Sequence, residues 1–145
     1  MRKMLLTALL CVGALMAQSQ NLTFKNTSSC TLYAILMADH SCTPTAPGPN
    51  YYQSHLVAIP AGAITTFNIN TFALWNGATP TLTGEHWLGV KLYGNLLCST
   101  NVIWVGACPG FGTTAMMPMD GSCNNCQQVT GEWSQNGTNY HVSIR

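Results

Sequence analysis

Charged side chains are scarce in this chain of 145 residues. Asp, Glu, Lys and Arg together make up 6% of it, and two of the five basic residues are Arg2 and Lys3. Beyond residue 18, three basic residues stand against four acidic ones, which gives a net charge of −1. So few cations cannot neutralise a row of phosphates or hold an anionic bilayer surface. The composition therefore argues against nucleic acid and anionic membranes as partners.

Catalytic signatures are missing as well. The sequence contains no His-Glu-x-x-His, Gly-x-Ser-x-Gly or Walker-type motif, each of which gathers ligands or a nucleophile in a fixed geometry. In strands, the neighbours Asp39-His40 and Glu85-His86 would point to opposite faces. With four acidic residues beyond residue 18, a two-carboxylate glycosidase has little to draw on, and Asp120 and Glu132 are the pair least obviously excluded. We therefore expect a protein without catalytic residues and without a cofactor.

The one long apolar run lies at the start of the chain. Arg2 and Lys3 precede an apolar run from Met4 to Met16, with small alanines near its end. This order is typical of a cleaved secretory signal peptide, and the run is too short for a permanent membrane anchor. We predict a signal peptide over 1–18 and one domain over 19–145. The protein is then secreted, extracellular or periplasmic, with no transmembrane anchor.

Cysteine usage fits an exported protein. One of the seven cysteines, Cys11, lies in the apolar run and would be removed with it. An even set in a small exported domain is typical of a disulfide framework. The six that remain are Cys30, Cys42, Cys98, Cys108, Cys123 and Cys126. Several pairings are open, and short-range bridges such as Cys30–Cys42 are our interpretation.

Short runs rich in β-branched and aromatic residues, separated by Gly, Pro, Asn and Ser, indicate strands. The expected strands cover 21–26, 30–37, 55–59, 64–69, 87–93, 102–108, 129–133 and 140–144. No amphipathic helix of ordinary length stands out among them. This spacing predicts an all-β fold: a single antiparallel β-sandwich, or barrel-like, domain stapled by disulfides.

Two pairs of strands are expected to organise the domain. The runs 87–93 and 102–108 are apolar at nearly every position, so we expect them to pair and to be covered on both faces, with Trp87 and Trp104 in the core. Asn136-Gly137 tolerates positive φ and predicts the turn of a closing hairpin.

The remaining connections are less regular. The segment 21–26 is expected to form a hairpin with 30–37 across Thr27-Ser-Ser29. The segment 109–128 is rich in Gly, Met and Cys, and we expect it to be a loop.

Three features of the sequence carry a resemblance: the opening Phe24-Lys-Asn-Thr-Ser-Ser-Cys30, the turn Pro60-Ala-Gly62 and the closing segment 133–144. Together with the signal peptide they make the chain similar to small cysteine-bridged secreted β-proteins of Bacteroidetes. That resemblance implies a compartment and a fold, but no activity. The opening also resembles that of thaumatin-like proteins over the first third. The chain lacks their acidic cluster, so no thaumatin function is carried over.

Aromatic side chains in loops are the first candidates for ligand binding. Tyr51, Tyr52 and Trp75 lie in segments rich in turn residues, where binding residues tend to occur. Their rings could stack on sugars. The same rings could instead cap the core, because loop aromatics commonly do so.

The methionine-rich stretch is the second candidate. Met116, Met117 and Met119 precede Cys123-Asn-Asn-Cys126, and thioethers and thiolates are ligands that Cu(I) prefers. In an exported protein the cysteines usually oxidise, and methionine is also a common core residue. We therefore favour packing and disulfide formation over metal binding here.

These observations favour a secreted, non-enzymatic binding or structural module. Its partner would be a glycan or an extracellular protein, or a second copy through self-association, since near-zero net charge promotes association. The first alternative is a small secreted metal-binding, redox or hydrolytic protein that uses the Met/Cys loop or the histidines. The second alternative is a membrane-active protein.

Overall fold

The structure is a computed structural model and describes residues 20–39, 52–70, 75, 86–94, 102–117 and 128–145. These residues form an all-β fold without helices. Accordingly, none of them belongs to a helix that could cross a membrane. The predicted signal peptide over 1–18 lies outside the described residues, as do Tyr51, Met119 and Cys42, Cys98, Cys123 and Cys126.

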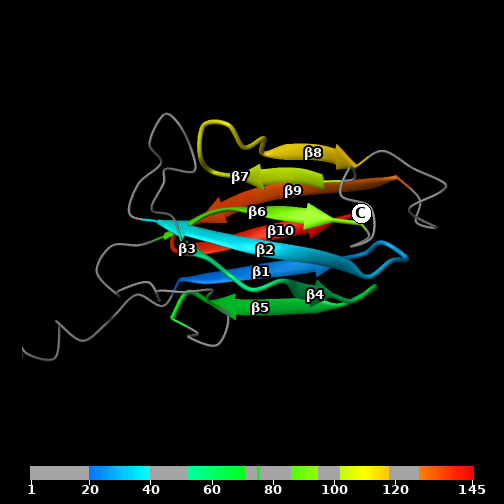
Figure 1. Ribbon diagram of the computed structural model, residues 1–145, viewed down its shortest axis with the longest axis horizontal. Helices are drawn as coiled ribbons and strands as arrows, with labels where there is room; N and C mark the ends of the chain where they lie inside the picture. The colour runs from blue at the N-terminus through cyan, green and yellow to red at the C-terminus, as the bar shows by residue number, and fades with distance from the viewer. Residues whose placement is uncertain (1–19, 40–51, 71–74, 76–85, 95–101, 118–127) are drawn as a thin grey trace, which may run out of the picture.

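The strands are arranged in two layers. The first sheet has the order β5-β1-β10-β9-β8, and the second has the order β3-β2-β6-β7 with β4 beside β2. In Figure 1 the strands of both sheets run along the long axis, as in an aligned sandwich. The bounds are β1 Asn21–Asn26, β2 Leu32–Asp39, β3 Tyr52–Gln53, β4 Val57–Ile59, β5 Ile64–Asn68, β6 His86–Tyr93, β7 Val102–Gly106, β8 Thr114–Met117, β9 Val129–Asn136 and β10 Asn139–Ile144.

Both organising pairs are confirmed. β6 pairs with β7 and β9 pairs with β10, each antiparallel. The turn between β9 and β10 contains Gly137 at a φ of 61°, a left-handed conformation that glycine adopts without steric cost. Tyr140, Val142 and Ile144 are buried, whereas His141 is exposed, as the alternation of a half-buried strand requires.

The predicted hairpin between 21–26 and 30–37 is wrong. β1 pairs with β5 and, in parallel, with β10, whereas β2 pairs with strands of the second sheet. The segment between β1 and β2 therefore crosses from one layer to the other, and so does the segment between β4 and β5. Hydrophobic alternation shows which face of a strand is buried, but it does not identify the neighbouring strand.

The segment 109–128 is not entirely loop. Thr114–Met117 forms β8, which pairs antiparallel with β9 at the edge of the first sheet. The strand is short, and its alternation is visible only once its partner is known, because Ala115 and Met117 face inward while Met116 is exposed.

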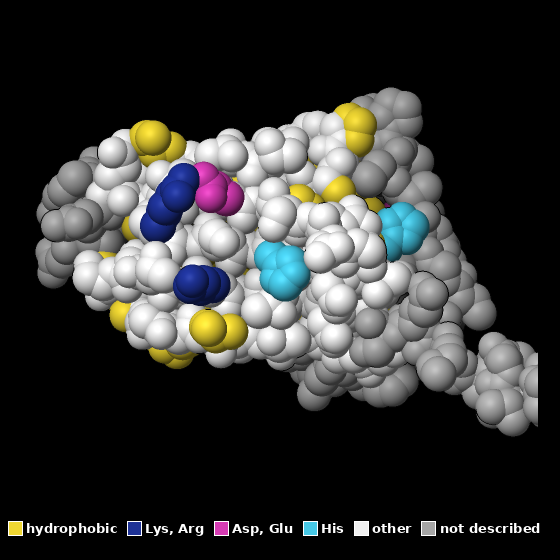
Figure 2. Space-filling view, turned by 180° about the vertical axis from the view of Figure 1, so that it is seen from behind, with side chains coloured by type: hydrophobic (Ala, Val, Ile, Leu, Met, Phe, Trp, Pro, Cys, Tyr) yellow, Lys and Arg dark blue, Asp and Glu magenta, His cyan; other side chains and the backbone are white. Residues whose placement is uncertain are grey.

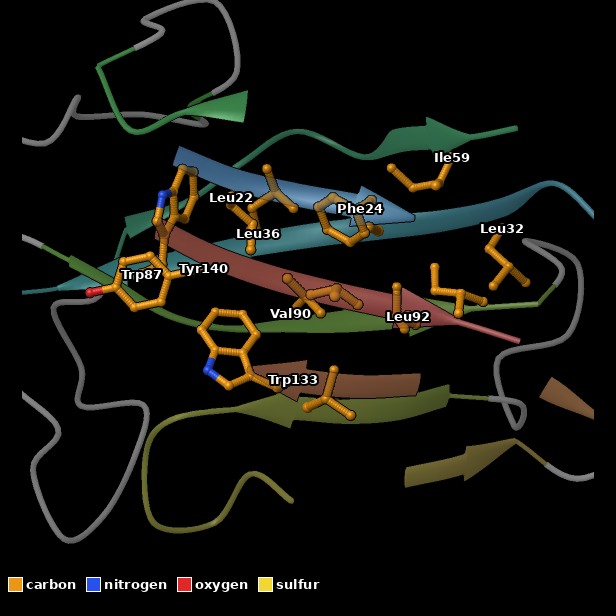
Figure 3. Packing of buried hydrophobic residues seen from close by; sticks show 14 of the residues in the cluster. Leu22, Phe24, Leu32, Leu36, Ile59, Trp87, Val90, Leu92, Trp133 and Tyr140 are labelled. Atoms are coloured by element: carbon orange, nitrogen blue, oxygen red, sulfur yellow. The ribbon is translucent and has the colours of Figure 1, made fainter. Parts of the chain in front are cut away.

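The core lies between the two sheets. Figure 3 shows Leu22, Phe24, Trp133 and Tyr140 of the first sheet directed toward Leu36, Val90 and Leu92 of the second. A smaller cluster lies outside this layer, where Met37, Leu88 and Cys108 pack with Trp104 and Phe111. β6 is thus covered on both faces near its start, but Lys91 and Tyr93 are half-exposed, so the predicted burial of the whole run is confirmed only in part.

The side chain of Asn26, at the end of β1, joins the two layers. It is 1% exposed, and its Nδ2 donates to the carbonyl oxygens of Cys30, Ile59 and Pro60 at 2.8, 3.0 and 3.0 Å. Its Oδ1 accepts from the backbone N–H and the hydroxyl of Ser28 at 3.0 and 2.6 Å. Cys30 and Pro60 belong to the two crossing segments, so one amide satisfies polar groups of both.

Replacing Asn26 with alanine should destabilise the protein strongly. The substitution leaves several buried carbonyl and N–H groups without a partner, at a cost of about 3 kcal/mol in the free energy of unfolding. Urea denaturation of the oxidised protein measures it. Asn139→Ala, at an exposed position of β10, is the matched control and should cost about 0.5 kcal/mol or less. Similar losses for both variants would contradict the role given to Asn26.

Candidate functional site

Of the three loop aromatics predicted to bind ligand, Trp75 lies in the core. It is 5% exposed, its ring stacks on Trp87 at 5.6 Å between centroids, and its Nε1 donates to the carbonyl oxygen of Ile69 at 2.8 Å. Tyr52 packs edge-on against Trp75 at 6.3 Å and is half-buried. Tyr51 lies outside the described residues. Trp75 therefore offers little ring surface to a ligand.

The hydrogen bond of Trp75 can be tested against a matched tryptophan. Trp133 is also buried, but its Nε1 has no hydrogen-bond partner within the described part of the chain. Trp75→Phe should therefore cost about 1–2 kcal/mol more than Trp133→Phe, because only the first leaves a buried carbonyl unsatisfied. Urea denaturation of both variants measures the difference. Equal destabilisation would show that the Trp75 bond adds no net stability.

Two methionines of the second candidate site, Met116 and Met117, lie on opposite faces of β8. Met116 is 57% exposed, whereas Met117 is 1% exposed and belongs to the core. The side-chain amide of Gln128 contacts the sulfur of Met116. Met119 lies outside the described residues. Within those residues, no group of three or more His, Cys, Asp or Glu side chains could hold a metal ion.

Two of the six framework cysteines are described, and both are disulfide-bonded. They are Cys30, in the segment between β1 and β2, and Cys108, which is 2% exposed in the smaller cluster. The other four cysteines lie outside the described residues. The pairing, including Cys30–Cys42, stays a prediction.

The acidic side chains and histidines are spread over the molecule. Asp39 lies opposite His86 in the register of β2 and β6, so the structure brings together members of the two pairs Asp39-His40 and Glu85-His86. Glu132, on the first sheet, forms an ion pair with Arg145. His40, Glu85 and Asp120 lie outside the described residues.

The outer face of the second sheet carries a group of side chains that the sequence did not single out. Ala34, Leu36, Val90 and Leu92 are buried in the core, so their neighbours along β2 and β6 point outward. We call three of these outward residues, together with Trp104 of β7, the aromatic strip: Tyr33, Lys91, Tyr93 and Trp104. All four are partly exposed.

Strand register places the members of the aromatic strip side by side. Tyr33 lies opposite Tyr93, and Lys91 lies opposite Trp104. The Lys91 ammonium is 4.9 Å from the centroid of the Tyr93 ring and 5.0 Å from that of Trp104. Each contact has the geometry of a cation–π interaction, worth roughly 0.5–1 kcal/mol at a partly exposed site. The cation thus links two rings of the strip.

The strip rests on a tightly packed base. Trp104 packs on Phe111 at 5.6 Å between centroids, and Phe111 lies over Gly89, which pairs with Gly106. A Cβ on Gly89 would come within 2.7 Å of the carbonyl oxygen of Val105, so only glycine permits this approach of β6 to β7. The ring of Trp104 is therefore held in place by packing on Phe111.

The outer face of the first sheet has a different chemistry. Its exposed or half-exposed side chains are mostly uncharged amides and hydroxyls, and Thr23 and Thr66 form a hydrogen bond between their hydroxyls at 3.0 Å. Figure 2, seen from behind, shows a face with few charged and few hydrophobic side chains among the coloured residues. A polar recess of about 270 Å³ lies near its end, lined by Thr27, Ser28, Ser29, Gln128 and Arg145.

Alternation in β2 and β6 was the signal that could have identified the aromatic strip. This alternation is obscured because 87–93 is apolar at nearly every position, a pattern that predicts burial of the whole run. Trp104, expected in the core, is half-buried on the outer face instead.

Comparison with known proteins does not assign this chain to a family. No protein-family model matches the chain, and no curated protein or solved structure is significantly similar to it.

Proposed function

We propose that this protein is a secreted, non-enzymatic binding module whose aromatic strip binds a neutral glycan. The observation that carries the proposal is the grouping of Tyr93 and Trp104 around Lys91, with Tyr33 opposite Tyr93, on one outer face. Tyrosine and tryptophan give large, rigid contact areas at low entropic cost, and each combines an apolar body with a polar tip. A pyranose ring has the matching combination of an apolar face and peripheral hydroxyls.

The charge of the strip favours a neutral partner. Lys91 is the one charged member, and its ammonium lies over two rings, where the ring quadrupoles already interact with it. No carboxylate belongs to the strip, so it offers no pair of acidic groups for glycoside hydrolysis. Binding without cleavage is the activity that these four side chains support.

Secretion is part of the proposal. The charged start and apolar run over 1–18 support export, and an oxidising compartment suits the six cysteines of the framework. The disulfide-bonded state of Cys30 and Cys108 fits that compartment. The resemblance to small cysteine-bridged secreted β-proteins of Bacteroidetes is consistent with this location.

Binding should be lost when a ring of the strip is removed. We expect protein exported from a bacterial host to be retained by at least one neutral polysaccharide on a glycan array. Tyr93→Ala should then weaken binding about fivefold to thirtyfold, because an aromatic contact contributes about 1–2 kcal/mol. Isothermal titration calorimetry with the retained oligosaccharide measures the affinity.

Two variants serve as controls for that experiment. His141→Ala changes an exposed residue on the outer face of the first sheet and should leave the affinity unchanged. Tyr93→Phe retains the ring and should lose less affinity than Tyr93→Ala. Absence of any retained neutral glycan, or equal affinity of Tyr93→Ala and the unchanged protein, would refute the proposal.

A further inference from the structure

β8 carries two consecutive methionines that differ sharply in exposure. Met116 is 57% exposed, whereas Met117 is 1% exposed and belongs to the core. Successive side chains of a strand point to opposite faces, so one thioether lies on the outer face of the first sheet and the other lies between the sheets. Met37, the third methionine in the described part of the chain, is fully buried. Of these three thioethers, Met116 is the one that a solute can reach.

The sulfur of Met116 has a polar neighbour on one side. Gln128, immediately before β9, directs its side-chain amide N–H at this sulfur. Thr130 lies opposite Met116 in the register of β8 and β9. A thioether sulfur is a weak hydrogen-bond acceptor, and it has two lone pairs. The amide of Gln128 engages one of them, so the sulfur is open to solvent at the other.

We propose that Met116 is a site of oxidation by peroxide and that Gln128 determines the configuration of the product. The sulfur attacks one oxygen of hydrogen peroxide, the O–O bond breaks, an S–O bond forms and water leaves. The thioether is oxidised by two electrons to a sulfoxide, and the peroxide is reduced. Methionine sulfoxide is chiral at sulfur. Because Gln128 engages one lone pair, oxygen adds mainly at the other, and one epimer forms in excess.

The fold accommodates a sulfoxide at Met116. The added oxygen lies on the outer face of the first sheet and points toward solvent, so no polar group is buried. The same oxygen on Met117 would lie in the core, where a polar group without a partner is costly. The alternation of β8 therefore places the reactive thioether where its oxidation does little damage, next to one whose oxidation would disrupt the packing.

Oxygen transfer suits the methionine-rich stretch better than metal binding does. Met116 and Met117 point to opposite faces of β8, so they cannot ligate the same ion. A single exposed thioether is sufficient for reaction with peroxide, because susceptibility follows exposure. The aromatic strip lies on the other sheet and takes no part in this reaction.

Mild treatment of the folded, exported protein with hydrogen peroxide tests the proposal. Met116 should be oxidised at least about tenfold faster than Met117 and Met37, because buried thioethers react only when the fold opens. Peptide mapping by tandem mass spectrometry measures the three rates separately. In the control, the same protein unfolded in urea, the three rates should be similar. Equal rates in the folded protein would overturn the proposal.

The configuration of the product tests the role of Gln128. Two methionine sulfoxide reductases each reduce one epimer, and we expect one of them to reduce most of the Met116 sulfoxide formed in the folded protein. Gln128→Ala should yield the two epimers in similar amounts. Gln135→Ala removes another exposed amide, on β9, and should leave the excess unchanged.

Two outcomes of this second experiment would overturn the proposal. They are similar amounts of both epimers in the unchanged protein, and an excess that Gln128→Ala leaves intact. Failure of glycan binding would leave both experiments unaffected.

Discussion

The two sheets depend on one buried amide for their connection at the end where the chain crosses between them. Asn26 belongs to the first sheet, yet its Nδ2 donates to Ile59 of β4 in the second. The same side chain satisfies carbonyls of both crossing segments, at Cys30 and Pro60. Because a buried carbonyl without a partner is costly, these segments are constrained to approach each other. The hydrogen bonds of Asn26 therefore hold the two layers together at this end of the sandwich.

The sequence predicts where most strands lie and which face of several is buried, but it does not predict which strands distant in the chain pair with each other. The β9–β10 turn could be predicted because Asn136-Gly137 has a specific backbone preference. The pairing of β1 could not, because its partners lie 43 and 118 residues away in the registers Thr23–Thr66 and Asn21–Asn139. No local pattern encodes such a long-range choice, since alternation specifies only a face.

The candidate site, too, could be predicted only as far as local sequence patterns reach, because its residues come together through strand pairing. Trp75 was interpreted as a loop aromatic because turn residues surround it, but its stacking on Trp87 gives it a place in the core. Lys91 and Tyr93 lie in a run that is apolar at nearly every other position, so their shared outward face is not evident from the sequence. Only the register with β2 and β7 shows that they share a face with Tyr33 and Trp104. Sites assembled across strands are visible in the sequence only when the pairing is known.

The parallel pairing of β1 with β10 has a consequence for how the chain matures. β1 begins at residue 21, and its neighbour β10 ends at residue 144. While the polypeptide is being synthesised, the middle of the first sheet stays open until β10 has emerged. A nascent chain therefore cannot complete this layer early. The proposed export requires a chain that has not yet closed its fold, and this pairing keeps the first sheet open until β10 has been made.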